Sequence, residues 1–282
     1  MKPKLPVIII LVLFIAAACT ERINVKLDTT YTRLVVDGAL MNDTTPCKII
    51  LTKSAYYFYN QPVPAVTNAT VTIDDGSAIW HLKETMPGIS GIYRPDSLLK
   101  GMIGKTYTLH IILADAINNH SEYTAACKLD TVAHLDSISY EFHSEFGKDG
   151  VYIITVYAQE PPELGNYYMF LWYRNGVLMS DSIQEVSLTD DQFINGNYIN
   201  GAGVIFINQS HSWEKIAPGD TIMLRMSGIT KEYYDFVQEV QIAGFNIPLF
   251  TGPPANVVGN IDNGGIGFFA AYSNSLAKTV IK

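Results

Sequence analysis

The 282-residue sequence predicts a mainly β protein made of two β-rich units, the second of which carries one amphipathic helix. Three observations support this prediction. Apolar and polar residues alternate with a period of two along most of the chain, Asp-Gly and Asn-Gly turns join neighbouring apolar runs, and a single segment has apolar residues at helical spacing. Because 48% of the residues are hydrophobic and only 16% are charged, the chain can bury one large core or two moderate ones.

The first unit, residues 31–130, contains seven short runs with the strand pattern. In one of them Tyr107, Leu109 and Ile111 alternate with polar residues, as expected for a strand with one face in water. The segment Asp74-Asp75-Gly76-Ser77 predicts a hairpin turn, because Asp-Gly tolerates positive φ. We therefore expect an immunoglobulin-like or transthyretin-like β-sandwich. The expected strands are 32–40, 46–54, 66–74, 78–84, 90–94, 105–113 and 121–129.

The second unit, residues 131–282, is expected to be a further β-sandwich-like unit. Asn175-Gly176 is the strongest hairpin signal in the chain. A helix is predicted near 230–243, where apolar residues recur at helical spacing, with Thr230 as its cap and Gly244 as its terminator. This helix should lie across a sheet. The expected strands are 138–142, 151–158, 167–173, 177–186, 203–208, 221–226 and 266–272.

The N-terminus has the three-part layout of a signal peptide. Lys2 and Lys4 precede an apolar stretch, and three alanines lead to Cys19. The apolar stretch is shorter than the roughly 20 residues that a membrane-spanning helix requires. We predict a signal peptide over 1–18, lipid attachment at Cys19 and a tether over 19–30. Ala16 stands where the lipoprotein motif usually has leucine, so a soluble secreted form is the alternative. Thr20 favours the outer membrane, because no acidic residue follows the cysteine.

Cys47 and Cys127 are the two remaining cysteines, and both share their strand parity with apolar residues. Both thiols should therefore point inward. An exported pair of this kind is either a disulfide or two buried free thiols, and the sequence leaves both alternatives open.

Charge and motifs argue against several functions. A formal net charge of -8 without a local Lys/Arg cluster disfavours nucleic-acid binding. His143-Ser144-Glu145 lacks the Cys-x-x-Cys that would complete a zinc deaminase motif. Asp190-Asp191 has only Asn195 and Asn197 as nearby oxygen donors, which favours a solvated turn over a calcium site. We accordingly predict no catalytic residue, no metal and no cofactor.

Two aromatic groups are candidate binding surfaces. Tyr56, Tyr57, Phe58 and Tyr59 are consecutive, so in an extended segment they cannot all face one side. They form either a covered strand edge or a platform for a sugar, a peptide or a protein partner. The second group, Phe193, Tyr198, His211 and Trp213, is expected in a long connection between strands.

Several segments together resemble a known family. They are the lipoprotein-like start, Leu34-Val35-Val36-Asp37-Gly38, Ala69-Thr70-Val71-Thr72-Ile73, Gly91-Ile92-Tyr93, Gly104-Lys105-Thr106-Tyr107-Thr108-Leu109, Leu135-Asp136-Ser137-Ile138, 229–236 and 260–272. In this order, with the helix followed by a Pro-rich loop, they are similar to the domain-of-unknown-function 4249 lipoproteins. The resemblance spans nearly all of the mature chain. It implies an outer-membrane lipoprotein of one Gram-negative phylum, often encoded near TonB-dependent transporters, with no catalytic residues to transfer.

We therefore expect a non-catalytic outer-membrane lipoprotein that binds a carbohydrate or peptide ligand, or serves as an accessory component of a TonB-dependent nutrient uptake system. The alternatives are a structural or adhesion-type envelope protein and, less favoured, an envelope hydrolase. An aromatic cleft between the units would favour binding, and a flat surface would favour adhesion. A concave cluster of titratable residues would favour catalysis.

Overall fold

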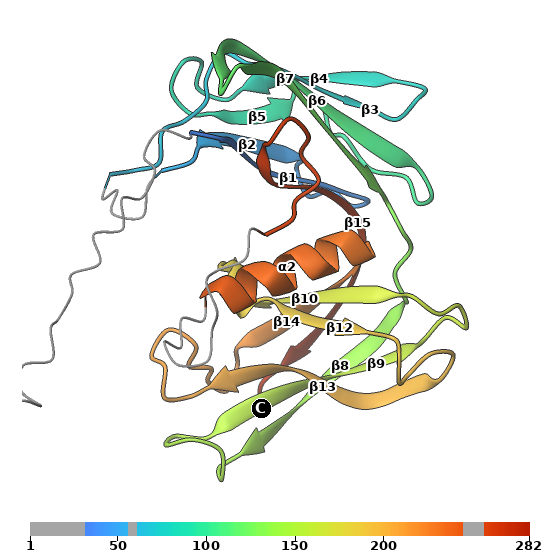
Figure 1. Ribbon diagram of the computed structural model, residues 1–282. Helices are drawn as coiled ribbons and strands as arrows, with labels where there is room; N and C mark the ends of the chain where they lie inside the picture. The colour runs from blue at the N-terminus through green and yellow to red at the C-terminus, as the bar shows by residue number, and fades with distance from the viewer. Residues whose placement is uncertain (1–31, 56–60, 245–256) are drawn as a thin grey trace, which may run out of the picture. The chain divides into compact units, whose positions relative to one another are not determined.

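The computed structural model describes residues 32–55, 61–244 and 257–282 (Figure 1). The predicted fold class is confirmed: the chain is 51% strand and 7% helical, with two sheets and one α-helix among the described residues. In that part of the chain no helix is both long and apolar enough to cross a membrane. The predicted signal peptide, the tether with Cys19 and the Tyr56–Tyr59 group lie outside the described residues.

All seven strands expected in the first part of the chain are present. Their order in the sheet is β1-β2-β5-β4-β3-β6-β7, and they enclose a core whose largest fully buried side chains include Tyr93, Tyr107 and Tyr123. The strands are β1 (Leu34–Met41), β2 (Lys48–Lys53), β3 (Thr70–Asp74), β4 (Ile79–Glu84), β5 (Ile92–Pro95), β6 (Thr106–Ile117) and β7 (His120–Lys128).

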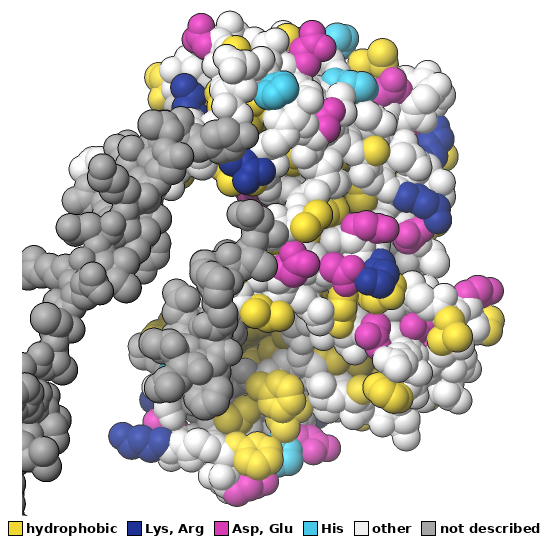
Figure 2. Space-filling model, viewed as in Figure 1, with side chains coloured by type: hydrophobic (Ala, Val, Ile, Leu, Met, Phe, Trp, Pro, Cys, Tyr) yellow, Lys and Arg dark blue, Asp and Glu magenta, His cyan; other side chains and the backbone are white. Residues whose placement is uncertain are grey.

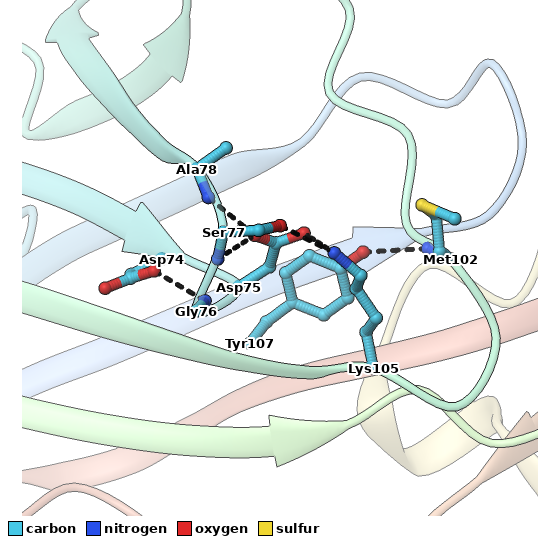
Figure 3. Close-up of polar contacts among 8 residues, drawn as sticks. All are labelled: Asp74, Asp75, Gly76, Ser77, Ala78, Met102, Lys105 and Tyr107. Atoms are coloured by element: carbon cyan, nitrogen blue, oxygen red, sulfur yellow. Dashed lines mark hydrogen bonds and ion pairs between the residues drawn. The ribbon is translucent and has the colours of Figure 1, made fainter.

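The predicted hairpin turn between β3 and β4 is confirmed, and Figure 3 shows its contacts. The Asp75 carboxylate accepts hydrogen bonds from the backbone N–H groups of Ser77 and Ala78, at 2.9 and 2.8 Å. Gly76 has a φ of 81°, the conformation that favours glycine here. Lys105 Nζ lies 2.5 Å from Asp75 Oδ2, so the turn is also tied to the start of β6. These contacts hold the pKa of Asp75 below its usual value, with the Lys105 hydrogen bond as the largest cause.

The later strands form two layers around a second core. A three-stranded sheet of order β13-β9-β8 faces β10 and β14, and Ile154, Phe170 and Leu224 are buried between the layers. Alternation along β10 directs Tyr168, Phe170 and Trp172 into this core. The strands are β8 (Leu135–His143), β9 (Val151–Gln159), β10 (Tyr167–Arg174), β11 (Val177–Leu178), β12 (Ser187–Asp190), β13 (Tyr198–Asn208) and β14 (Thr221–Ile229).

The strand expected over 177–186 is wrong. Only Val177 and Leu178 pair, as β11, and the chain then forms the short 3-10 helix η1 (Ile183–Glu185). Ser182 caps it in a reciprocal arrangement with Glu185, which satisfies backbone N–H groups that a strand would have paired with a neighbour. The side chain of Ser180 accepts a hydrogen bond from the backbone N–H of Trp172 and fixes the preceding turn.

The final strand, β15 (Ile266–Val280), joins the two halves of the large sheet. Residues 266–272 pair in parallel with β1, and residues 273–280 pair antiparallel with β14. Only 266–272 is expected from sequence, because the apolar run ends at Ser273. The described residues from 32 onward thus form one compact unit with two cores, and Phe268 and Phe269 of β15 belong to the first core.

Helix α2 (Lys231–Gly244) confirms the predicted helix and lies beside β10 and β15 (Figure 1). The Thr230 hydroxyl accepts a hydrogen bond from Tyr233 N at 3.3 Å, and Gly244 is the last helical residue. Tyr233, Tyr234 and Phe236 pack against the first core, so the helix covers the face of β10 opposite the second core.

Cys47 and Cys127 are both buried, as parity predicts, and both are free thiols, so the structure does not contain the candidate disulfide. Cys47 precedes β2, whereas Cys127 Sγ accepts a hydrogen bond from Ala271 N of β15 at 3.1 Å.

Candidate functional site: a cavity beside helix α2

A cavity of about 380 Å³ lies where α2 meets β1, β10, β15 and the 180–186 segment. It therefore borders elements of both cores. An aromatic cleft in this region is the feature expected above for a binding role. Ligand sites are commonly apolar cavities of a few hundred Å³ with a small number of polar groups. The residues that line it are Val35, Val36, Asp37, Met169, Leu171, Ser180, Asp181, Ser182, Ile183, Val186, Tyr233, Phe236, Val240, Gly267, Phe268 and Tyr272.

Four aromatic rings form one side of this cavity. Tyr233 and Phe236 come from one face of α2, three residues apart, and Phe268 and Tyr272 come from one face of β15. The centroid of the Tyr233 ring lies 5.0 Å from Phe268 and 6.2 Å from Tyr272. Phe236 lies 5.2 Å from Phe268. Because the rings also contact one another, their positions are fixed by the fold before any ligand arrives.

The polar groups of the cavity are acidic or neutral. Asp37 and Asp181 are exposed, and in the described part of the chain neither carboxylate has a hydrogen bond or an ion pair. Among the described residues that line the cavity, none is Lys, Arg or His. Burial, with the nearby Asp37 charge as a smaller cause, raises the pKa of the Tyr233 phenol. The pKa of Tyr272 is raised mainly by burial as well, so both phenols stay neutral at physiological pH.

These features suit recognition of a small molecule. The aromatic wall offers apolar contact, and the two unpaired carboxylates accept hydrogen bonds from hydroxyl, amide or ammonium groups. The serines are committed locally: Ser180 accepts from Trp172 N at 3.0 Å, and Ser182 accepts from Gln184 N at 3.3 Å.

The predicted group of Phe193, Tyr198, His211 and Trp213 is not one site. The sequence suggests that β13 starts at 203, but it starts at Tyr198 and continues through irregular pairing near Gly201 and Gly203. Phe193 and Tyr198 therefore lie at one end of an 11-residue strand, and His211 and Trp213 lie beyond the other end. At about 3.3 Å per residue the two pairs are roughly 30 Å apart.

His211 and Trp213 nevertheless form an exposed aromatic pair. Their rings are stacked 4.8 Å apart at 11°, and His211 Nδ1 lies 3.0 Å from Glu214 Oε1. Trp213 is 58% exposed, and Phe206 of β13, which the sequence did not single out, is 64% exposed. Figure 2 shows hydrophobic side chains gathered on the region of the surface where β13 and β14 lie in Figure 1. A smaller cavity of about 260 Å³, lined partly by Phe206 and Glu214, opens between β13 and the 184–187 segment.

No local pattern in the sequence indicates the cavity beside α2. Phe236 and Phe268 belong to periodic apolar patterns, which are typical of ordinary core positions. More than thirty residues also separate the two in the sequence. The available signal is Asp37, an acidic residue in the middle of the apolar strand β1, whose neighbour across the strand pair is Phe268. Asp37 lies on the same face of β1 as Val35, because side chains alternate along a strand. A charged side chain on that face indicates that the face is partly open to solvent.

No curated protein matches the chain in sequence. A family model does match, over residues 20–277, and it covers most of the chain, from before β1 through the helix and into β15. By this match the chain belongs to the family described as domain of unknown function, DUF4249.

Proposed function

We propose that this protein is a non-catalytic, lipid-anchored protein of the bacterial outer membrane that binds a small ligand in the cavity beside α2. In this proposal it serves as a binding or accessory component of a TonB-dependent nutrient uptake system. The observation that carries the binding role is the preformed aromatic wall of Tyr233, Phe236 and Phe268 next to two unpaired carboxylates. The location rests on the N-terminal sequence, and the uptake system rests on the family resemblance.

The chemistry of the lining indicates the class of ligand. The apolar wall suits a ring face or an aliphatic chain, and Asp37 and Asp181 suit groups that donate hydrogen bonds. A sugar presents hydroxyl donors around a partly apolar ring, and a peptide presents N–H donors and ammonium groups. Both fit this description, whereas a free carboxylate or phosphate would meet the two negative charges unfavourably.

One experiment tests the site. Val240 lines the cavity from α2, and Ile242, on the same helix, is 66% exposed and is not among the lining residues. A panel of short sugars and peptides is screened by thermal shift with the detergent-solubilised full-length protein. For a hit, Val240→Trp should weaken binding at least about 30-fold by occupying the cavity, roughly 2 kcal/mol. Ile242→Trp should leave the affinity within threefold; equal effects of both changes would reject the cavity as the site.

The anchor is tested separately. Wild-type protein should incorporate labelled palmitate and partition into detergent, and Cys19→Ala should move it to the aqueous phase, because lipid chains supply the membrane affinity. If the wild type takes up no palmitate, the lipoprotein part of the proposal is wrong. A TonB-dependent transporter that copurifies from solubilised membranes would support the uptake role.

A specific observation favours a second candidate function, a structural or adhesion-type role. Trp213 and Phe206 expose large apolar side chains at the surface, as protein contact sites often do. If Trp213→Ala abolishes cell-surface or protein contacts while ligand binding at α2 is undetectable, that role replaces the first.

A further inference from the structure

The turn between β4 and β5, residues 85–91, exposes two large apolar side chains. Met86 is 55% exposed and Ile89 is 70% exposed. Val63 is 56% exposed as well, in a neighbouring segment whose Ala65 lies next to this turn. This end of the first core therefore presents several apolar side chains at its surface, where water alone would not favour them.

The backbone of this turn satisfies its own hydrogen-bond donors. Each N–H group from residue 85 to residue 91 donates to an oxygen of the turn or of its two flanking residues, at 2.8 to 3.3 Å, and Pro87 has no N–H group. The donors and acceptors are Thr85 N to Ile92 O, Met86 N to Ser90 Oγ, Gly88 N to Glu84 Oε2, Ile89 N and Ser90 N to Met86 O, and Gly91 N to Glu84 Oε1. The turn can therefore leave water without leaving an N–H group unpaired.

The connection between β5 and β6 also exposes apolar side chains, but its backbone differs. Leu98, Met102 and Ile103 are each between 56% and 59% exposed. Within the described part of the chain, however, the N–H groups of Leu98 and Ile103 have no hydrogen-bond partner. Water has to satisfy these donors, so this connection suits an aqueous surface and the β4–β5 turn suits an apolar one.

These two connections lie at opposite ends of β1. Leu51 N donates to Gly91 O at 2.9 Å, and the end of β2 pairs with the start of β1, so the β4–β5 turn lies where the described chain begins (Figure 1). Gly101 N donates to Met41 O, the last residue of β1, at 2.8 Å. At about 3.3 Å per residue, β1 separates the two ends by roughly 23 Å. The turn with the satisfied backbone is therefore the one nearer to the N-terminal segment.

We propose that Met86 and Ile89 insert into the surface of the membrane to which the protein is anchored. This contact rests on the lipid anchor of the proposed function. Cys19 precedes Thr32, the first described residue, by 13 positions, a path of at most about 45 Å. Because the anchor keeps the turn close to the bilayer, a modest affinity of the two side chains is sufficient. Apolar side chains at such a surface reach roughly 5 to 10 Å into the boundary between headgroups and acyl chains.

The test compares two isoleucines at opposite ends of β1. Ile89→Cys and Ile103→Cys are each labelled with the fluorophore NBD in the full-length protein. Cys47 and Cys127 are buried, so the label reaches the introduced thiol. The protein is reconstituted through its own anchor into phosphatidylcholine vesicles, whose neutral headgroups limit electrostatic attraction. Flotation of the vesicles measures anchoring, and brominated acyl chains measure contact with the label by quenching its fluorescence.

We expect brominated lipid to lower the fluorescence of the label at residue 89 at least about twofold, and to leave the label at residue 103 nearly unchanged. Met86→Asp should reduce the quenching at residue 89 by more than about half, because a carboxylate disfavours the apolar boundary. Met102→Asp is the matched control and should not change it. Both methionines are exposed, so thermal unfolding of the two variants should match that of the wild type.

Three results would overturn the inference, and they differ in what else they affect. If the protein floats with the vesicles but the label at residue 89 is not quenched, or both labels are quenched equally, the turn does not contact the membrane although the anchor exists. If the unlabelled wild type does not float, the anchor fails and the membrane contact fails with it. If the emission of the label at residue 89 changes with protein concentration without vesicles and is not quenched by them, the turn contacts a second copy of the protein instead.

Discussion

The two aromatic regions of this protein differ in what holds their rings. Beside α2, Phe268 is 5% exposed and its ring contacts Tyr233 and Phe236. At the end of β13, Trp213 is 58% exposed, and the only described ring on which it stacks is that of His211. In the first region the rings contribute both to the fold and to a preformed cavity, and in the second they contribute little to the fold. Ring content alone therefore does not distinguish a binding cavity from a contact surface, but burial does.

The largest expected effect concerns the cavity wall. Phe268→Ala should lower the free energy of unfolding by about 3 to 5 kcal/mol, because it removes a buried ring and leaves a cavity. Denaturant unfolding measures it, with Phe206→Ala as the exposed control, for which we expect less than about 1 kcal/mol. Equal losses in the two variants would remove the distinction between the regions.

The second effect tests how closely β1 and β15 approach at the cavity. Gly267 has a φ of 97°, and a Cβ there would overlap the carbonyl oxygen of Val36. Gly219 has a similar φ of 95°, but a Cβ there meets nothing. Gly219→Ala should therefore lower the free energy of unfolding by only the backbone strain, about 1 kcal/mol. Gly267→Ala should lower it by about 2 kcal/mol more. A similar loss in both variants would indicate that β1 shifts freely.

The third prediction concerns reactivity of the buried thiols rather than stability. Burial raises the pKa of Cys47 to about 12 and that of Cys127 to about 11, from ordinary values of 9. The thiolate fraction at neutral pH is then lower by roughly a hundredfold to a thousandfold. Iodoacetamide should modify neither thiol in the folded protein and both after denaturation without reductant. A protein with no alkylatable cysteine at 47 and 127 after denaturation would instead contain the disulfide.

The smallest effect is expected at the exposed aromatic pair. Trp213→Ala should change the free energy of unfolding by less than about 0.5 kcal/mol, because a single stacked contact with His211 is lost at the surface. Thermal unfolding checks this. A loss above 2 kcal/mol would show that Trp213 is held by contacts beyond that stack.

The sequence predicts local structure here better than it predicts the site. Alternation located the seven strands from β1 to β7, and the Thr230 cap located α2, because these signals lie within a few consecutive residues. The alternation did not indicate the second half of β15, because Ser273 to Ser275 interrupt the apolar pattern there although they pair with β14. The cavity requires residues far apart in the chain, and their proximity depends on the strand order of the folded protein, which no local pattern encodes.

The comparison between the two aromatic regions is tested most directly by ligand affinity in two variants. Calorimetric titration of a ligand identified by thermal shift is carried out with Val240→Trp, which fills the cavity, and with Trp213→Ala, which removes the exposed ring. We predict at least a 30-fold loss of affinity in Val240→Trp and a change within threefold in Trp213→Ala. A loss in Trp213→Ala with unchanged binding in Val240→Trp would contradict the assignment of the cavity beside α2 as the binding site.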